Sequence, residues 1–502
     1  MLNLALSFAV RTVFIHTLGE LYTGINSILA GVLTILNLAN LGIDVAIAYA
    51  MYKPAAENDI PKLRSLLEFY RKAFLVIGAV ILIAGLALTP VIPTLAKGVT
   101  DVKNLRYIYW LFLSDTVFTC WCFFYLTSIL IVEQQRYVFI LVDYYTGTIQ
   151  ALVRIAVLFL LRSRPMTAFY IYTILGIVTK LTRNYIVRCK VVKRYPWVLD
   201  KRPLPLSREE KQGIYKNMVG MFASNVCRVL NDNLDTVIIS GFLGVAVTAV
   251  YSNYLLIKFY ISQLLKTIMD PLTESVGNLC AMESREKKES FFYTLHFFCF
   301  WLFGWCSICF WILFNPFIAG VWLLDTHWLL PDLSVLLLTV NFLIEGLMKA
   351  VTIYRDANGL FWETRHRYAF SAVLNAGLSI LLVGPAKMGV AGAILGTTVS
   401  VCIMLSFDPV LVYRKVFGRG AGRYYFLYFR DMAVVMATGA LVHVLCLPLS
   451  VFTVWNFLLR GLVCVIVPNA LWFLLYHRDP KFAYLRDTAV STLRRLAGKL
   501  RR

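Results

Sequence analysis

Long apolar runs alternate with short polar segments along almost the whole chain. Between residue 1 and about residue 477 the runs are long enough to cross a bilayer, since a helix needs about 20 mostly apolar residues to span the hydrocarbon core. A spanning segment must also satisfy its own backbone hydrogen bonds, which favours helices over strands. The pattern therefore predicts an all-α polytopic membrane protein.

The apolar runs predict about fourteen transmembrane helices. Their centres lie near residues 10, 36, 84, 120, 150, 177, 230, 257, 306, 341, 376, 400, 439 and 464. The least regular are the run near residue 10, which carries Arg11, and the run near residue 230, which carries Arg228, Asp232 and Asp235. An even number of spans places both termini on the same side of the membrane.

Lys and Arg residues collect in alternate connections between these runs. The segments 51–73, 133–137, 189–217, 266–289, 354–368, 414–430 and the tail from 477 hold 34 of them, whereas the intervening connections hold 6. Because short cytoplasmic loops retain positive charge, the basic set and both termini are predicted to be cytoplasmic. The net charge of +21 is then a topology signal and not a sign of nucleic-acid binding. A mean hydropathy of +0.70 agrees with a membrane protein.

The longest polar connection divides the chain near its middle, as a linker between two helix bundles does. It is basic and contains Pro196, Pro203 and Pro205. The predicted divisions are an N-terminal six-helix lobe 1–188, a basic cytoplasmic linker 189–217, a C-terminal six-helix lobe 218–416, two additional transmembrane helices 417–477 and a basic amphipathic cytoplasmic tail 478–502. In the tail, apolar residues recur at steps of three and four with Arg and Lys between them, which predicts a helix lying on lipids of the inner leaflet.

Sequence signatures of enzymes are missing from the chain. It contains no phosphate-binding loop with a lysine, no dinucleotide-binding glycine pattern, no zinc-protease motif and no nucleophile elbow. The glycines of segment 389–396 (GVAGAILG) fit close packing of a spanning helix instead. We therefore expect no catalytic residues, no metal and no cofactor.

Charged residues inside the apolar runs are the candidates for function, because a central Arg, Lys or Asp costs about 2.5 to 3.5 kcal/mol on insertion scales and normally faces a cavity or a partner. Two pairs lie four residues apart and can neutralise each other on one helix face, Arg228 with Asp232 and Glu345 with Lys349. The cations that remain candidates for binding an anionic head group, spread over both halves, are Arg11, Arg154, Arg228, Lys258 and Lys349. Arginine suits phosphate and pyrophosphate because its planar fork binds oxygens bidentately. The alternative for each is a structural ion pair.

Four acidic residues in the runs are candidates for ion coupling or a conformational switch. They are Asp44, Asp232, Asp235 and Glu345. Neighbouring carboxylates in a low-dielectric setting repel each other, which favours uptake of H+ or Na+. The alternative is again structural, with Asp232 held by Arg228 and Asp235 capping a break in its helix.

Several short motifs resemble the polysaccharide flippases of the multidrug/oligosaccharidyl-lipid/polysaccharide exporter superfamily. The first half contributes segments 11–19 (RTVFIHTLG), 22–26 (YTGIN), 41–46 (LGIDVA) and 51–55 (MYKPA). The second half contributes segments 231–240 (NDNLDTVIIS), 251–256 (YSNYLL), 356–362 (DANGLFW), Asn375 with Ser379, and 389–400. Only ten residues precede Arg11, fewer than in those relatives, so we expect the first helix to be truncated in this sequence.

The resemblance implies a V-shaped pair of six-helix lobes with two extra C-terminal helices. It also implies a transporter that flips a polyprenyl-pyrophosphate-linked oligosaccharide from the inner to the outer leaflet of the bacterial cytoplasmic membrane, with glycan polymerases or glycosyltransferases as partners. Sugars and a pyrophosphate cannot cross hydrocarbon unaided, because each unsatisfied polar group costs several kcal/mol there. The alternatives are a multidrug or cation antiporter of the same superfamily, a membrane glycosyltransferase or polymerase, and a non-transporting component of glycan assembly. The central basic residues disfavour the antiporter, and the short outward connections disfavour the glycosyltransferase.

Overall fold

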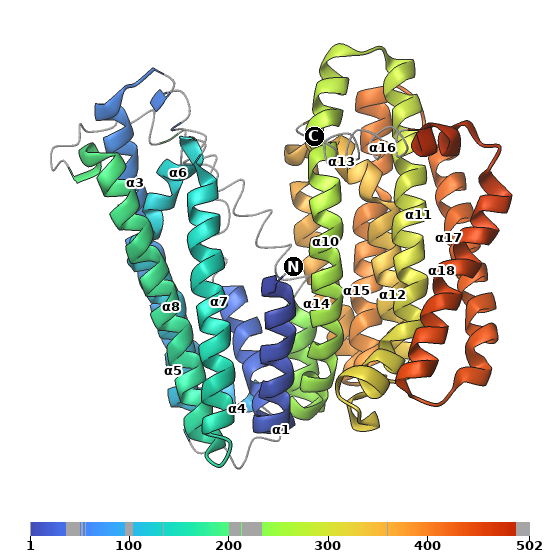
Figure 1. The fold of residues 1–502 in the computed structure, drawn as a ribbon. Helices are drawn as coiled ribbons and strands as arrows, with labels where there is room; N and C mark the ends of the chain where they lie inside the picture. The colour runs from blue at the N-terminus through green and yellow to red at the C-terminus, as the bar shows by residue number, and fades with distance from the viewer. Residues whose placement is uncertain are drawn as a thin grey trace, which may run out of the picture. The chain divides into compact units, whose positions relative to one another are not determined.

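The computed structural model describes residues 2–36, 51, 54–55, 57–95, 104–133, 135–199, 212, 233–358 and 360–487. In these ranges the regular structure is helical throughout, and no strand occurs. The chain divides into two compact units, Met1–Asn253 and Tyr254–Arg502. Figure 1 shows each unit as a bundle of long helices that run alongside one another.

Eight helices of the described ranges are long and apolar enough to cross a membrane, and ten when each bent pair counts as one span. Helices cover the predicted centres, apart from the centre near residue 230, which lies outside the described residues. The prediction of an all-α polytopic membrane protein is confirmed.

The first unit is built from helices that pack through aromatic and aliphatic side chains. Its elements are α1 (Leu2–Leu36), α3 (Ile60–Leu88), α4 (Ile92–Leu95), α5 (Leu105–Trp121), α6 (Thr127–Val132), α7 (Arg136–Leu160), α8 (Pro165–Arg194) and a helix over Asn233–Leu243. α7 packs against α1 and α8, and α5 packs against α3 and α8. The Phe14 ring of α1 meets the rings of Phe169 and Tyr172 of α8, with centroids 5.8 and 4.9 Å apart.

The second unit is organised around α11. Its elements are α10 (Val245–Met282, which begins in the first unit), α11 (Arg285–Phe317), α12 (Asp332–Leu347), α13 (Lys349–Ala357), α14 (Phe361–Val383), α15 (Gly389–Ser406), α16 (Asp408–Val412), α17 (Gly422–Cys446) and α18 (Val454–Tyr476). α12, α17 and α18 all pack on α11, and α14 pairs with α15 (Figure 1). The two additional C-terminal helices predicted from the sequence are thus α17 and α18.

Breaks in the helices follow local backbone chemistry. Gly19 interrupts α1 with φ 79° and ψ −175°, a conformation that is essentially open only to glycine. It falls between the predicted centres near residues 10 and 36. α5 and α6 meet at a bend of 42° and α12 and α13 at a bend of 41°. Phe123, at φ 60°, lies in the first of these bends.

Charged side chains hold several helices together. In the first unit the Nζ of Lys180 lies 2.5 Å from Oδ2 of Asp115, and Nη1 of Arg183 lies 2.7 Å from Oδ1 of Asp143. Both basic residues come from α8, and the acids come from α5 and α7. These pairs explain how α8 carries charge inside a membrane-spanning bundle.

The division of the chain into the five predicted segments stays a prediction. The compact units meet between Asn253 and Tyr254, whereas most of the predicted linker 189–217 lies outside the described residues. The first part of the predicted amphipathic tail is a helix up to residue 487. In it Phe482 stacks on Trp301 of α11 with ring centroids 5.5 Å apart, so this part of the tail packs on protein.

Candidate functional site

Arg11 is bound to the chain segment that begins the second half of the sequence. Its guanidinium donates from Nη2 to Oγ of Ser252 at 2.6 Å and to Oδ1 of Asn253 at 2.9 Å, and from Nε to the same Asn253 oxygen at 3.2 Å. The neighbouring Tyr251 forms a side-chain hydrogen bond with Asp235. Three consecutive residues of α10 therefore hold one predicted cation and one predicted carboxylate.

Arg154 lies against α8 through its planar guanidinium. Nε and Nη2 donate to the backbone carbonyl of Tyr172 at 3.2 and 3.1 Å, and the guanidinium carbon lies 3.9 Å from the centre of the Tyr172 ring. A Cβ on Gly176 would come within 2.9 Å of Nη2, so the glycine makes room for the arginine. This arrangement ties α7 to α8 and leaves the guanidinium partly exposed.

Lys258 and Lys349 both belong to the second unit. Nζ of Lys258 lies 3.9 Å from Oε1 of Glu345, and that carboxylate is partly exposed. The expected pairing of Glu345 with Lys349 on one helix face is not what the structure shows. α12 ends at Leu347 and α13 begins at Lys349, so the two residues belong to different helices, and the carboxylate of Glu345 pairs with Lys258 of α10.

The remaining predicted site residues divide into one that is described and three that are not. Asp235 is buried in the first unit, in the helix that starts at Asn233. Asp44, Arg228 and Asp232 lie outside the described residues. The structure thus gathers Arg11 with Asp235 around residues 251–253, and Lys258 with Glu345 between α10 and α12. The role of each in binding or coupling stays a prediction.

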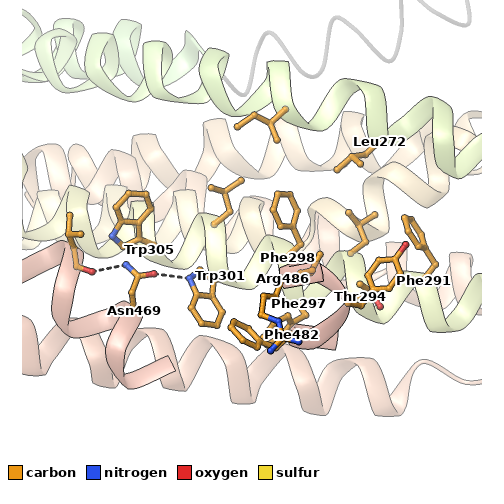
Figure 2. A pocket seen from close by; sticks show the side chains of 16 residues that line it. Leu272, Phe291, Thr294, Phe297, Phe298, Trp301, Trp305, Asn469, Phe482 and Arg486 are labelled. Carbon is orange, nitrogen blue, oxygen red and sulfur yellow. Dashed lines mark hydrogen bonds between the residues drawn. The ribbon is translucent and has the colours of Figure 1, made fainter. Parts of the chain in front are cut away.

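A groove of about 910 Å³ lies in the second unit between α10, α11, α18 and the tail helix. Figure 2 shows aromatic side chains of α11 along its length, with Phe482 and Arg486 of the tail near the middle. Trp301 donates from Nε1 to Oδ1 of Asn469 at 2.8 Å, and Trp305 donates to the carbonyl of Cys464 at 3.0 Å. The indole N–H groups are therefore satisfied by α18, and the ring faces line an apolar surface.

The sequence analysis did not single out this groove. The part of its lining that belongs to α11 comes from the aromatic segment 291–305 (FFYTLHFFCFWLFGW). By sequence alone this segment predicts only another apolar transmembrane helix. The signal available was the density of large rings: bulky aromatic side chains along one helix leave hollows unless the neighbouring helices fill them. The polar Asn469 inside the apolar segment 454–476 was a second signal.

No profile of a known protein family matches the chain, and no curated protein matches it in sequence. Solved structures resemble it in fold. The lipid II flippase MurJ in an inward closed conformation has a TM-score of 0.68 at 13% identity, covering 95% of this chain and 97% of that one. An inward-facing multidrug resistance transporter of the MATE family has a TM-score of 0.58 at 13% identity, covering 82% and 94%. A MOP superfamily transporter from Pyrococcus furiosus has a TM-score of 0.53 at 14% identity, covering 82% and 94%.

The chain therefore has the fold of the MOP superfamily, the multidrug/oligosaccharidyl-lipid/polysaccharide exporters. The resemblance stated from short motifs is confirmed at the level of the fold. Both kinds of neighbour, a lipid flippase and multidrug transporters, share this fold, so the fold alone does not choose between them.

Proposed function

We propose that this protein is a secondary-type transporter of the bacterial cytoplasmic membrane that flips a polyprenyl-pyrophosphate-linked oligosaccharide from the inner to the outer leaflet. The observation that carries the proposal is the apolar groove of the second unit. A polyprenyl chain is long, flexible and purely apolar, and a groove walled mainly by aromatic and aliphatic side chains offers it apolar contact along most of its length.

The predicted cations of the same unit fit the other end of such a molecule. Nζ of Lys258 lies 3.9 Å from Oε1 of Glu345, a partly exposed carboxylate, and Lys349 begins α13 at the bend of the α12–α13 pair. No ion pair of Lys349 is found in the described part of the chain. A pyrophosphate is attracted to two such ammonium groups, whereas a cationic drug is repelled.

The solved structures that resemble the chain include a flippase of a lipid-linked molecule as well as multidrug transporters. The alignment with the lipid II flippase extends over nearly the whole chain, and those with the multidrug transporters leave about a sixth of it uncovered. Moving a sugar pyrophosphate across hydrocarbon is then a matter of shielding the head group in the protein while the tail stays in the groove and the bilayer.

The test is flipping of a fluorescent polyprenyl-pyrophosphate oligosaccharide in proteoliposomes. Val465 lines the groove and is 50% exposed, and its neighbour Ile466 is 53% exposed and does not line it. We expect Val465→Gln to reduce flipping by roughly 5-fold or more, because an amide in the tail path is desolvated without a partner. Ile466→Gln is the matched control and retains the rate of the unmodified protein.

A parallel assay with a cationic dye separates the alternatives. Transport of the dye without flipping of the lipid supports the multidrug antiporter and overturns the proposal. If neither is moved by protein whose folding is verified, a non-transporting role in glycan assembly is supported. Equal flipping by the Val465 and Ile466 variants removes the groove from the mechanism.

A further inference from the structure

A second pocket lies in the first unit, where the start of α7 meets the end of α8. Its volume is about 540 Å³. One wall is apolar and aromatic, with Tyr137, Val138 and Leu141 of α7, and the other is basic, with Lys190, Lys193 and Arg194 of α8. The pocket therefore combines a surface for hydrocarbon with a cluster of positive charge.

The basic wall follows from the spacing of the residues along α8. Positions 190, 193 and 194 lie three and four apart, so they share one face of the helix, and all three side chains are exposed. In the part of the chain that the structure describes, the ion pairs of α8 are those of Lys180 and Arg183, and Lys190 and Lys193 form none. Their charges are available to a ligand.

Arg194 is held in place by the turn that precedes α7. With its amide oxygen facing α8, Gln135 accepts hydrogen bonds from Nε and Nη2 of Arg194 at 3.1 and 2.8 Å and from the hydroxyl of Tyr195 at 3.2 Å. That hydroxyl also lies 3.4 Å from Oε2 of Glu133. Among the described residues that line the pocket, three are basic and none is acidic, so the lining carries an excess of positive charge.

The apolar wall belongs to an exposed face of α7. α7 is the least covered candidate span of the first unit, with 6% of its apolar window buried. Tyr137, Ile140 and Leu141 are exposed near its first turns. The pocket thus lies where the exposed apolar side of α7 reaches the basic end of α8. The Lys and Arg distribution predicts this end of both helices to be cytoplasmic.

We propose that this pocket binds an anionic phospholipid of the cytoplasmic leaflet. Its phosphate lies between Lys190, Lys193 and Arg194, and its acyl chains run along Tyr137 and Leu141. Basic pockets between transmembrane helices at the cytoplasmic side suit such head groups, and a guanidinium fixed by Gln135 is prearranged to bind phosphate oxygens bidentately. The site is separate from the groove of the second unit and does not depend on what the protein transports.

The experiment measures lipid retention by the purified full-length protein with mass spectrometry under native conditions. The protein is titrated with phosphatidylglycerol, phosphatidylcholine or inorganic phosphate. Lys190→Gln with Lys193→Gln is compared with Arg414→Gln with Lys415→Gln, a control that removes the same charge from two exposed residues of another predicted cytoplasmic turn. We expect phosphatidylglycerol to bind roughly 30-fold more weakly to the first variant, with the control unchanged.

Each other outcome overturns the proposal. Equal loss of phosphatidylglycerol in both double variants shows that only net charge matters. Phosphatidylcholine bound as tightly as phosphatidylglycerol shows that the pocket does not recognise the head group. Equally tight binding of inorganic phosphate shows that the apolar wall plays no part. The charge-conserving variant Lys190→Arg with Lys193→Arg retains the lipid if the site is as proposed, which excludes misfolding as the cause of loss.

Discussion

Replacing Asp408 by asparagine keeps the size of the side chain but removes the charge that faces two arginines. Oδ2 of Asp408 accepts from Nη1 of Arg355 at 2.7 Å, and Oδ1 accepts from Nη1 of Arg367 at 2.9 Å. The side chains of Asp408 and Arg355 are only 3% and 8% exposed. The carboxylate therefore joins α16 to α13 and α14 in a setting where water cannot replace it.

The expected loss follows from this burial. Removing one partner of a buried ion pair costs about 3 to 5 kcal/mol, because the remaining charge is left without compensation. Arg355 keeps Asp356 at 2.8 Å, a carboxylate that is 38% exposed. We therefore expect the free energy of unfolding to fall by about 3 kcal/mol, at the lower end of that range.

The measurement is unfolding of purified protein in mixed micelles, followed by circular dichroism as the fraction of denaturing detergent rises. The control is Glu283→Gln, which breaks the exposed pair with Lys287 and is expected to cost less than about 1 kcal/mol. A loss for Asp408→Asn as small as that of the control refutes the reasoning. Replacing Asp408, Arg355 and Arg367 together by leucine or methionine should recover part of the loss, because no buried charge then remains.

Three further predictions follow from local geometry. Gly19→Ala should lower the free energy of unfolding by about 1 to 3 kcal/mol, because alanine is strained in the backbone conformation of Gly19. Gly377→Ala in α14, with nothing within 4 Å of the added Cβ, should not lower it. Equal effects of the two changes would contradict the break in α1. Gly346→Ala brings a Cβ into the ring of Phe303 and should cost about 1 to 3 kcal/mol; an unchanged melting temperature would show that α11 and α12 are less closely packed. Asp235→Asn should slow flipping and flatten its dependence on an ion gradient while head-group binding survives; full transport with unchanged gradient dependence would leave Asp235 a structural role through Tyr251.

The helices could be predicted from the sequence because the bilayer imposes their length. Twenty apolar residues in a row have few other structures open to them, and the same holds for α17 and α18 as for the helices before them. Even the connection between the two parts of α1 was predictable, since Leu18 and Gly19 end an apolar run before the polar Glu20. These features depend on residues close together in the sequence.

Partners across helices could not be predicted in the same way. The predicted pairing of Glu345 with Lys349 assumed that one continuous helix carries both residues. In the structure α12 ends at Leu347 and α13 begins at Lys349, so that assumption was wrong. Lys258, the partner that the structure shows, is 87 residues away in sequence. The groove was missed for a similar reason, because a hollow depends on which faces of α10, α11 and α18 meet. Spacing within one helix carries no such information.

The hydrogen bonds of Arg11 have a consequence for biosynthesis. Their acceptors, Ser252 and Asn253, lie 241 and 242 residues further along the chain. At about 5 to 20 residues per second, a ribosome takes roughly 12 to 48 s to synthesise that stretch. During this interval the guanidinium has entered the membrane without the partners it has in the finished fold, where an uncompensated charge is costly. We therefore expect the first helix to stay beside the insertion machinery, or at the lipid head groups, until α10 emerges.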